Sequence, residues 1–230
     1  MTAALPRPAG VLFDLDGTLV DTVERRIEAW ARTFAEFGLP VDRGRLGPLI
    51  GADGKRLARE VAALSGVSLD ADRAEAIDRR CGEIYGALNV DPRPLPGVGE
   101  VVAALEGRGI AWAIATSSRR EQVGASVRAL GLEHEPRIVD GSHVQHAKPE
   151  PDLLLLGARE LGLAPGRCWY VGDSTWDVTA AIAAGMLPIA VTAGAAVSRV
   201  VLQGAGAVAV VATLGDVARL LDSPGREGAG

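Results

Sequence analysis

The most restrictive feature of this sequence is a series of short, almost uninterrupted apolar runs, several of which end in carboxylates or hydroxyls. They span residues 11–16, 110–117, 168–173, 188–192 and 207–212, with a weaker candidate at 137–141. Apolar runs without polar alternation are typical of parallel strands that are buried on both faces. The sequence therefore predicts a parallel β-sheet with helices on both sides.

Helical patterns separate most of these runs. They span residues 98–108, 121–130, 151–161 and 177–184. Pro151 stands at the start of the third segment, where the first turn of a helix tolerates proline. The alternation of strands and helices predicts an α/β fold with a Rossmann-like, doubly wound parallel sheet.

Residues 21–92 interrupt this alternation with helical patterns and no convincing strand. Apolar residues recur there at steps of three and four: Val23, Ile27, Trp30, Phe34 and Phe37, then Leu57, Val61 and Leu64, then Ile77, Cys81, Ile84 and Leu88. We predict an α/β core of residues 1–20 and 93–230 and an inserted all-helical cap subdomain of residues 21–92. The connections Val20–Asp21 and Asp91–Gly97 are expected to be hinges with few backbone hydrogen bonds.

The composition argues against several classes of protein. Of the 230 residues, 48% are hydrophobic and 23% are charged, which is typical of a folded chain. A net charge of −5 argues against nucleic acid or a membrane surface as a partner. No apolar run approaches the roughly 20 residues of a membrane-spanning helix, and residues 1–10 lack a signal-peptide core. Cys81 and Cys168 lack metal-ligand spacing. We expect a cytoplasmic protein with two buried, reduced thiols, either a monomer or a weak homodimer.

Acidic and hydroxyl side chains follow the predicted strands at their carboxyl ends. Asp14 and Asp16 close the first run, Thr116 and Ser117 the second, and Asp173 the third, with Asp177 one helical turn later. Ligands of open parallel sheets bind at these strand ends. Four carboxylates in one cleft would repel one another without a cation, and oxygen ligands of this kind suit Mg2+. Gly17 would allow a tight turn and a close approach of the backbone to a ligand.

Each of these features also has an ordinary structural explanation. An isolated Asp-x-Asp is usually a solvated turn, hydroxyls such as Thr116 often cap helices, and Lys148 could be a surface lysine. Lys55 and Lys148 are nevertheless the only lysines among 24 basic residues. A lysine retained in an arginine-rich chain marks a position that requires a compact ammonium group, unless it is there by chance.

Four motifs together resemble those of the haloacid dehalogenase superfamily of phosphohydrolases that use an aspartate nucleophile. They are Asp14–Asp21 (DLDGTLVD), the apolar strand ending in Thr116, Lys148–Asp152 (KPEPD) and Gly172–Asp177 (GDSTWD). The helical insert is similar to the type 1 cap of the branch that contains phosphoglycolate phosphatases and β-phosphoglucomutases. The resemblance covers nearly the whole chain.

This resemblance implies a role for each motif. Asp14 would attack phosphorus and form an aspartyl-phosphate, and Asp16 would act as the general acid and base. Thr116 would hold phosphoryl oxygens and Lys148 would neutralise charge. The implied substrate-binding residues are Gly17, Thr18 and Ser117. Apart from the resemblance, we interpret Lys55 and Arg56 as the cationic rim of a phosphosubstrate pocket rather than a solvated helix start. The implied metal group for Mg2+ comprises Asp14, the Asp16 carbonyl, Asp173 and Asp177, the last in an indirect role or orienting Lys148.

The sequence leaves three functions open. The first is a Mg2+-dependent phosphatase acting on a small phosphorylated metabolite, such as a sugar phosphate or phosphoglycolate. The second is a phosphomutase of the β-phosphoglucomutase type, and the third is a non-catalytic phosphate-binding protein. Asp16 argues against a dehalogenase, which lacks an acid–base aspartate there. A phosphonatase needs a Schiff-base lysine, and the surroundings of Lys55, the only cap lysine, do not clearly match that branch.

Overall fold

The strands form one six-stranded sheet in which every neighbouring pair is parallel, as the apolar runs predicted. The structure is a computed structural model that describes residues 5–222, so positions 1–4 and 223–230 of the predicted core lie outside the described residues. The order is β5-β4-β1-β6-β7-β8. The strands are β1 (Gly10–Phe13), β4 (Ala111–Ala115), β5 (Ile138–Val139), β6 (Cys168–Gly172), β7 (Leu187–Val191) and β8 (Ala209–Val211).

Helices cover both faces of the sheet, and the side chains of β1 alternate between the two sides. Phe13 packs into a cluster with residues of α5 (Val98–Glu106) and α10 (Leu214–Asp222). Leu12 joins the opposite cluster with residues of α7 (Asp152–Glu160) and α8 (Thr175–Ala183). Burial on both faces explains why the sequence of this strand is apolar without alternation.

The remaining core helices are α6 (Arg120–Ala129), which the sequence predicted, and the short α9 (Arg199–Gly204). The sequence predicted neither α9 nor α10. Most strands of this sheet are shorter than the predicted runs, and the two shortest of them are β5 with two residues and β8 with three. The run at 137–141 ends early because Asp140 caps a 3-10 turn at Gly141–His143 and so turns the chain out of the sheet.

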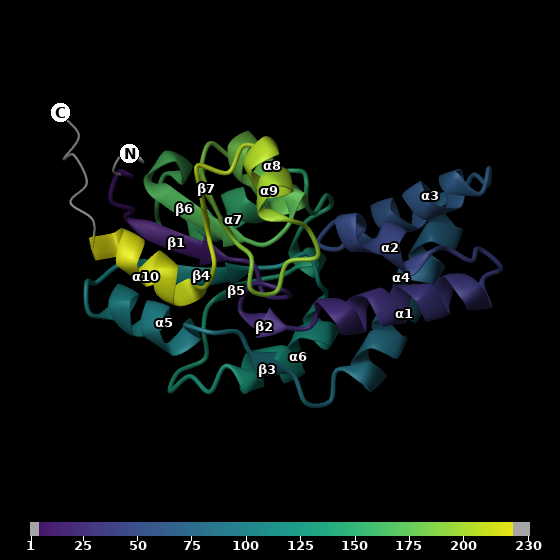
Figure 1. The fold of residues 1–230 in the computed structure, drawn as a ribbon, viewed down its shortest axis with the longest axis horizontal. Helices are drawn as coiled ribbons and strands as arrows, with labels where there is room; N and C mark the ends of the chain where they lie inside the picture. The colour runs from purple at the N-terminus through teal and green to yellow at the C-terminus, as the bar shows by residue number, and fades with distance from the viewer. Residues whose placement is uncertain (1–4, 223–230) are drawn as a thin grey trace.

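Four helices gather at one end of the molecule, beyond the edge of the sheet (Figure 1). They are α1 (Val23–Glu36), α2 (Arg43–Leu46), α3 (Gly54–Leu64) and α4 (Ala71–Leu88). They bury one shared apolar cluster, in which Trp30 stacks on Phe34 with ring centroids 5.3 Å apart. We call this group the cap; its exact limits at residues 21 and 92 stay a prediction. Leu64 departs from the predicted apolar face, because it ends α3 and is 57% exposed.

The two connections between core and cap are hydrogen-bonded to each other. β2 (Val20–Asp21) and β3 (Arg93–Pro94) form a short antiparallel ladder, which continues where the Leu95 amide donates to the Leu19 carbonyl at 2.9 Å. The expectation of connections with few backbone hydrogen bonds was therefore wrong. The chain enters and leaves the cap along neighbouring, opposite paths, and this is the geometry that an antiparallel pair requires.

Two expectations from composition can be compared with the structure. Cys81 and Cys168 are both buried and free, as predicted. None of the helices within residues 5–222 has the length and apolar character needed to cross a membrane.

The strand order places one end of the sheet at the centre of the molecule. Because β1 lies between β4 and β6, the segments that follow these three strands meet at their carboxyl ends. The chain order reverses at β1, which is the position where open α/β sheets bind ligands. The cap faces this edge (Figure 1).

Candidate active site

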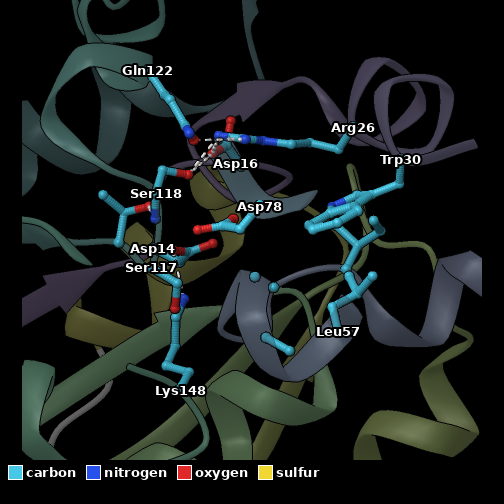
Figure 2. A pocket seen from close by; sticks show the side chains of 15 residues that line it. Asp14, Asp16, Arg26, Trp30, Leu57, Asp78, Ser117, Ser118, Gln122 and Lys148 are labelled. Carbon is cyan, nitrogen blue, oxygen red and sulfur yellow. Dashed lines mark hydrogen bonds and ion pairs between the residues drawn. The ribbon is translucent and has the colours of Figure 1, made fainter. Parts of the chain in front are cut away.

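A small cavity of about 50 Å3 lies between the carboxyl ends of the strands and the cap. Core residues after β1 and β4 line one side, and residues of α1, α3 and α4 line the other (Figure 2). Its charged side chains are Asp14, Asp16, Arg26, Asp78 and Lys148. The cavity has room for a few water molecules.

Lys148 lies fully buried between two carboxylates. Its Nζ donates to Asp14 Oδ1 and to Asp177 Oδ1, both at 2.7 Å, and to the Tyr170 hydroxyl at 3.2 Å. Burial lowers the pKa of this ammonium, but the two aspartates outweigh burial and hold the pKa well above its ordinary value. Lys148 is therefore a permanent positive charge inside the site, and the interpretation as a surface lysine is wrong.

Asp177 uses both carboxylate oxygens within the core. Its Oδ1 accepts from Lys148 and from the Tyr170 hydroxyl, and its Oδ2 accepts from the backbone amides of Asp173 and Ser174. The Ser174 hydroxyl also donates to Oδ2 at 2.6 Å. This arrangement caps the N-terminus of α8 and fixes the position of Lys148.

Three aspartates form the buried acidic group of the site. Asp14, Asp173 and Asp177 each bring a carboxylate oxygen within 4.8 Å of the others. Burial raises the pKa of Asp14 to about 7, although Lys148 counteracts it. Burial, together with the neighbouring carboxylates, raises the pKa of Asp173 well above its ordinary value. One ammonium does not balance three buried carboxylates, so the group lacks positive charge.

Gly17 and Thr18 hold Asp173 against the loop that follows β1. Gly17 has a φ of +82°, and a Cβ there would lie 2.4 Å from Asp173 Oδ2, so only glycine fits. The Thr18 hydroxyl donates to Asp173 Oδ1 at 2.8 Å. Both residues were predicted to bind substrate; the structure shows that the Thr18 hydroxyl contacts Asp173.

Thr116 and Ser117 lie on the β4 side of the cavity. The Thr116 hydroxyl is buried and accepts from the Ser118 amide at 3.2 Å. Ser117 Oγ is also buried, and no group among the described residues forms a hydrogen bond with it. A buried hydroxyl without a partner is costly unless a ligand or water satisfies it.

Asp16 turns away from the acidic group and toward the cap. Its Oδ2 accepts from Arg26 and from Ser118, both at 2.7 Å, while Oδ1 accepts from Thr22 at 2.7 Å and Tyr85 at 2.8 Å. Asp16 lines the same cavity as Asp14, but a cap arginine holds its side chain, which lies outside the group of three aspartates.

These contacts decide the ionisation of Asp16. Burial opposes the charged form, but the Arg26 guanidinium and the hydrogen bonds from Ser118, Thr22 and Tyr85 outweigh it. The pKa of Asp16 is therefore lowered below its ordinary value of 3.8, and the carboxylate is ionised in this arrangement. Arg26 also lies over the ring of Tyr85, 3.4 Å from its centroid.

Lys55 and Arg56, predicted as the cationic rim of the substrate pocket, do not line this cavity. They line a separate surface hollow instead. Lys55 Nζ lies 4.0 Å from Glu75, and Arg56 pairs with Glu60 and lies over the ring of Trp176. Both side chains leave the N-terminal turn of α3 toward a hollow that core residues 145–147 also line, a direction that their spacing in the sequence does not reveal.

Several residues of the cavity were missed at the level of sequence, among them Arg26, Asp78, Ser118 and Gln122. One signal was available for Arg26. It stands three residues after Val23 and four before Trp30, on the predicted apolar face of the first cap helix. A charged residue on such a face requires a buried partner, and here that partner is Asp16.

Comparisons with known proteins agree with this geometry. A family model described as haloacid dehalogenase-like hydrolase matches residues 8–185. The fructose-1-phosphate phosphatase YqaB of Escherichia coli is 35% identical over 182 residues, which cover 78% of this chain and 94% of that protein. The phosphoglycolate phosphatase of Xanthomonas campestris is 32% identical over 186 residues, covering 80% and 82% of the two chains. The crystal structure of a hydrolase from Pseudomonas syringae superposes with a TM-score of 0.87 at 29% identity and covers 93% of this chain and 97% of that one.

Proposed function

Because the chain belongs to the haloacid dehalogenase-like hydrolases, we propose that it is a Mg2+-dependent phosphatase acting on the monophosphate of a small metabolite. Relatives that are named phosphatases of fructose 1-phosphate and of phosphoglycolate support this activity. The observation that carries the proposal is the buried Lys148 ammonium, 2.7 Å from Asp14, in a cavity that it shares with the Ser117 hydroxyl, which has no partner among the described residues. Such a site provides an anionic nucleophile and donors for a phosphoryl group in one water-poor cavity.

The proposed reaction has two steps and begins at Asp14. An Asp14 carboxylate oxygen attacks phosphorus, the bond from phosphorus to the ester oxygen breaks, and Asp16 gives its proton to the departing alkoxide. Water then attacks the aspartyl-phosphate and loses its proton to Asp16, which releases inorganic phosphate and restores the Asp14 carboxylate. Lys148, Thr116 and Ser117 hold the phosphoryl oxygens during both steps.

Asp16 must change partners between the two steps. Paired with Arg26, it is ionised and ready to accept the proton of water. To donate a proton to the leaving group it must first carry one, which requires the Arg26 contact to loosen. Because Arg26 belongs to α1, we propose that movement of the cap couples substrate entry to protonation of Asp16.

The acidic group fits Mg2+ by the chemistry of its donors. Among the described residues, no group donates a hydrogen bond to Asp14 Oδ2 or Asp173 Oδ2. These two oxygens would hold the ion together with the Asp16 carbonyl, while Asp177 acts indirectly through Lys148. Bound there, Mg2+ would neutralise charge on the phosphoryl oxygens.

The proposal is tested by phosphate release from a panel of phosphorylated metabolites, with Mg2+ and with excess chelator. We expect Mg2+-dependent release that falls by several orders of magnitude in Asp14→Asn, since that variant lacks the nucleophile and a metal ligand. The matched control is Asp91→Asn, which makes the same substitution at an exposed position between α4 and β3. Release that persists in chelator or in Asp14→Asn contradicts the mechanism. Isomerisation of a sugar phosphate without net release would instead identify a phosphomutase.

A further inference from the structure

Asp78 is a cap residue that places a carboxylate in the cavity without any part in the proposed chemistry. It projects from α4, and its side chain is 15% exposed. Figure 2 shows it in the middle of the lining, with Asp14 and Ser118 to one side and Trp30 and Leu57 to the other. It therefore lies where the part of a substrate beyond its phosphate must sit.

The two oxygens of Asp78 have different surroundings. Oδ2 accepts from Arg119 at 2.8 Å, and Arg119 also donates to Glu75 at 2.8 Å. Among the described residues, no group donates a hydrogen bond to Oδ1. That oxygen packs against Gly54, where a Cβ would lie 1.9 Å from it, so only glycine fits beside the Asp78 carboxylate. Asp78 thus brings to the cavity lining a carboxylate whose Oδ1 can still accept a hydrogen bond.

The cations that line the cavity are already engaged. Arg26 is paired with Asp16, and Lys148 is paired with Asp14 and Asp177. Arg119, the partner of Asp78, does not line the cavity. In this arrangement both lining cations are held by carboxylates of the site, so a carboxylate on a leaving group would meet Asp78 with neither of them unpaired, whereas a hydroxyl would meet an acceptor.

We infer that Asp78 determines specificity by accepting a hydrogen bond from a hydroxyl of the leaving group, so that the enzyme favours monophosphates of neutral polyhydroxy compounds over those of hydroxy acids. Trp30 and Leu57 would contact the carbon skeleton on the opposite side. This inference rests on the proposed phosphatase function and selects within its substrate class. It concerns a residue that touches neither phosphorus nor the metal group.

Two substrates of matched size test the inference. The leaving groups of 2-hydroxyethyl phosphate and 2-phosphoglycolate differ only in a CH2OH group against a carboxylate. We expect the wild-type kcat/KM to favour 2-hydroxyethyl phosphate by at least about tenfold, as a charge-assisted hydrogen bond would provide. In Asp78→Asn that ratio should fall by about tenfold or more, with 2-phosphoglycolate hydrolysed as well as before or better.

Glu75→Gln is the matched control, because it removes the other carboxylate partner of Arg119 without changing the cavity lining. Its substrate ratio should stay at the wild-type value. If Asp78→Asn does not fold, as judged by thermal unfolding, Arg119→Gln serves instead. That variant leaves Asp78 without its cation and should raise the preference for 2-hydroxyethyl phosphate.

The results separate the two proposals. A wild-type preference for 2-phosphoglycolate, or an equal loss on both substrates in Asp78→Asn, overturns the specificity role and leaves the phosphatase function intact. Failure to release phosphate from any monophosphate in the panel overturns the phosphatase function itself.

Discussion

At the scale of single residues, position 148 is the one where we expect replacement of the native side chain to be tolerated least. Lys148 is buried between Asp14 and Asp177 and touches Tyr170, which leaves little room for a planar guanidinium. We expect Lys148→Arg to lose at least about tenfold in kcat, or about 1.4 kcal/mol of transition-state stabilisation. Steady-state rates on one hydrolysed substrate measure this. Lys55→Arg is the control, since Lys55 is only partly buried and outside the cavity; a Lys148→Arg enzyme with wild-type kcat would refute the argument.

The Asp16–Arg26 ion pair leads to a second prediction, about how the free energy of unfolding depends on pH. The pKa of Asp16 is lowered in the folded chain, so the pair stabilises the fold above the unfolded pKa, and this contribution is lost as the pH falls through the lower folded value. Arg26→Met leaves a buried carboxylate without its cation, so the pKa of Asp16 should rise. We expect a loss of about 3 kcal/mol in the free energy of unfolding near pH 7 and a smaller loss near pH 4.

Urea unfolding of both proteins at the two pH values tests this prediction. The control is Arg32→Met, which removes an exposed arginine of the same helix and should change stability little at either pH. An Arg26→Met variant whose loss is the same at both pH values would show that Asp16 does not titrate as the contacts require.

At the scale of elements, the N-terminus of α8 joins helix capping to the arrangement of the site. Ser174 caps the helix through Asp177, and Asp177 in turn holds Lys148. Ser174→Ala should lower the free energy of unfolding by about 1 kcal/mol and the Tm by about 2–4 °C. It should also lower kcat, because Asp177 loses a hydrogen-bond donor. Ser198→Ala is the control, since Ser198 begins α9 without a side-chain capping bond. Calorimetry measures the Tm of both variants, and steady-state assays measure their kcat. Equal changes in Ser174→Ala and Ser198→Ala would contradict the coupling between the helix cap and the site.

At the scale of the whole molecule, contacts between the cap and the core close the cavity. Arg119 in the core pairs with Glu75 and Asp78 of α4, and the Asp53 amide donates to the Lys148 carbonyl at 2.9 Å. The cavity of about 50 Å3 leaves little room for a metabolite, so we expect the cap to open before substrate binds. We expect AlF4− with Mg2+, as an analogue of the transferring phosphoryl group, to favour the closed arrangement.

Spin labels at Leu64→Cys in the cap and Ile182→Cys in the core would measure this change, because both positions are exposed and both native cysteines are buried. The distance distribution should narrow and shorten when Mg2+ and AlF4− are added. A pair within the core, Ile182→Cys with Val208→Cys, should give one distribution throughout. Identical distributions for the first pair with and without the analogue would contradict a mobile cap.

The sequence was sufficient for the sheet and for the order of the residues at its edge. Continuous apolar runs predicted parallel strands. Because the carboxyl ends of neighbouring parallel strands lie at the same end of the sheet, Asp14, Thr116 and Asp173 come together independently of the loop conformations. Gly17 was also predictable, because a tight turn after a strand that ends in carboxylates needs a residue with free φ. These features depend only on the local sequence pattern and on the parallel order of the strands in the sheet.

The tertiary structure alone decided the cap side of the site. The direction in which Arg26, Asp78 and Lys55 point depends on how four helices pack on one another and against the core. Periodicity predicts which face of a helix is buried, but it does not show which partner that face meets. Asp16 was therefore assigned to a cluster of four carboxylates, whereas the packed cap supplies Arg26 and withdraws its side chain from that cluster. Contacts between segments far apart in the chain are set by the packing of whole elements, and no local spacing encodes them.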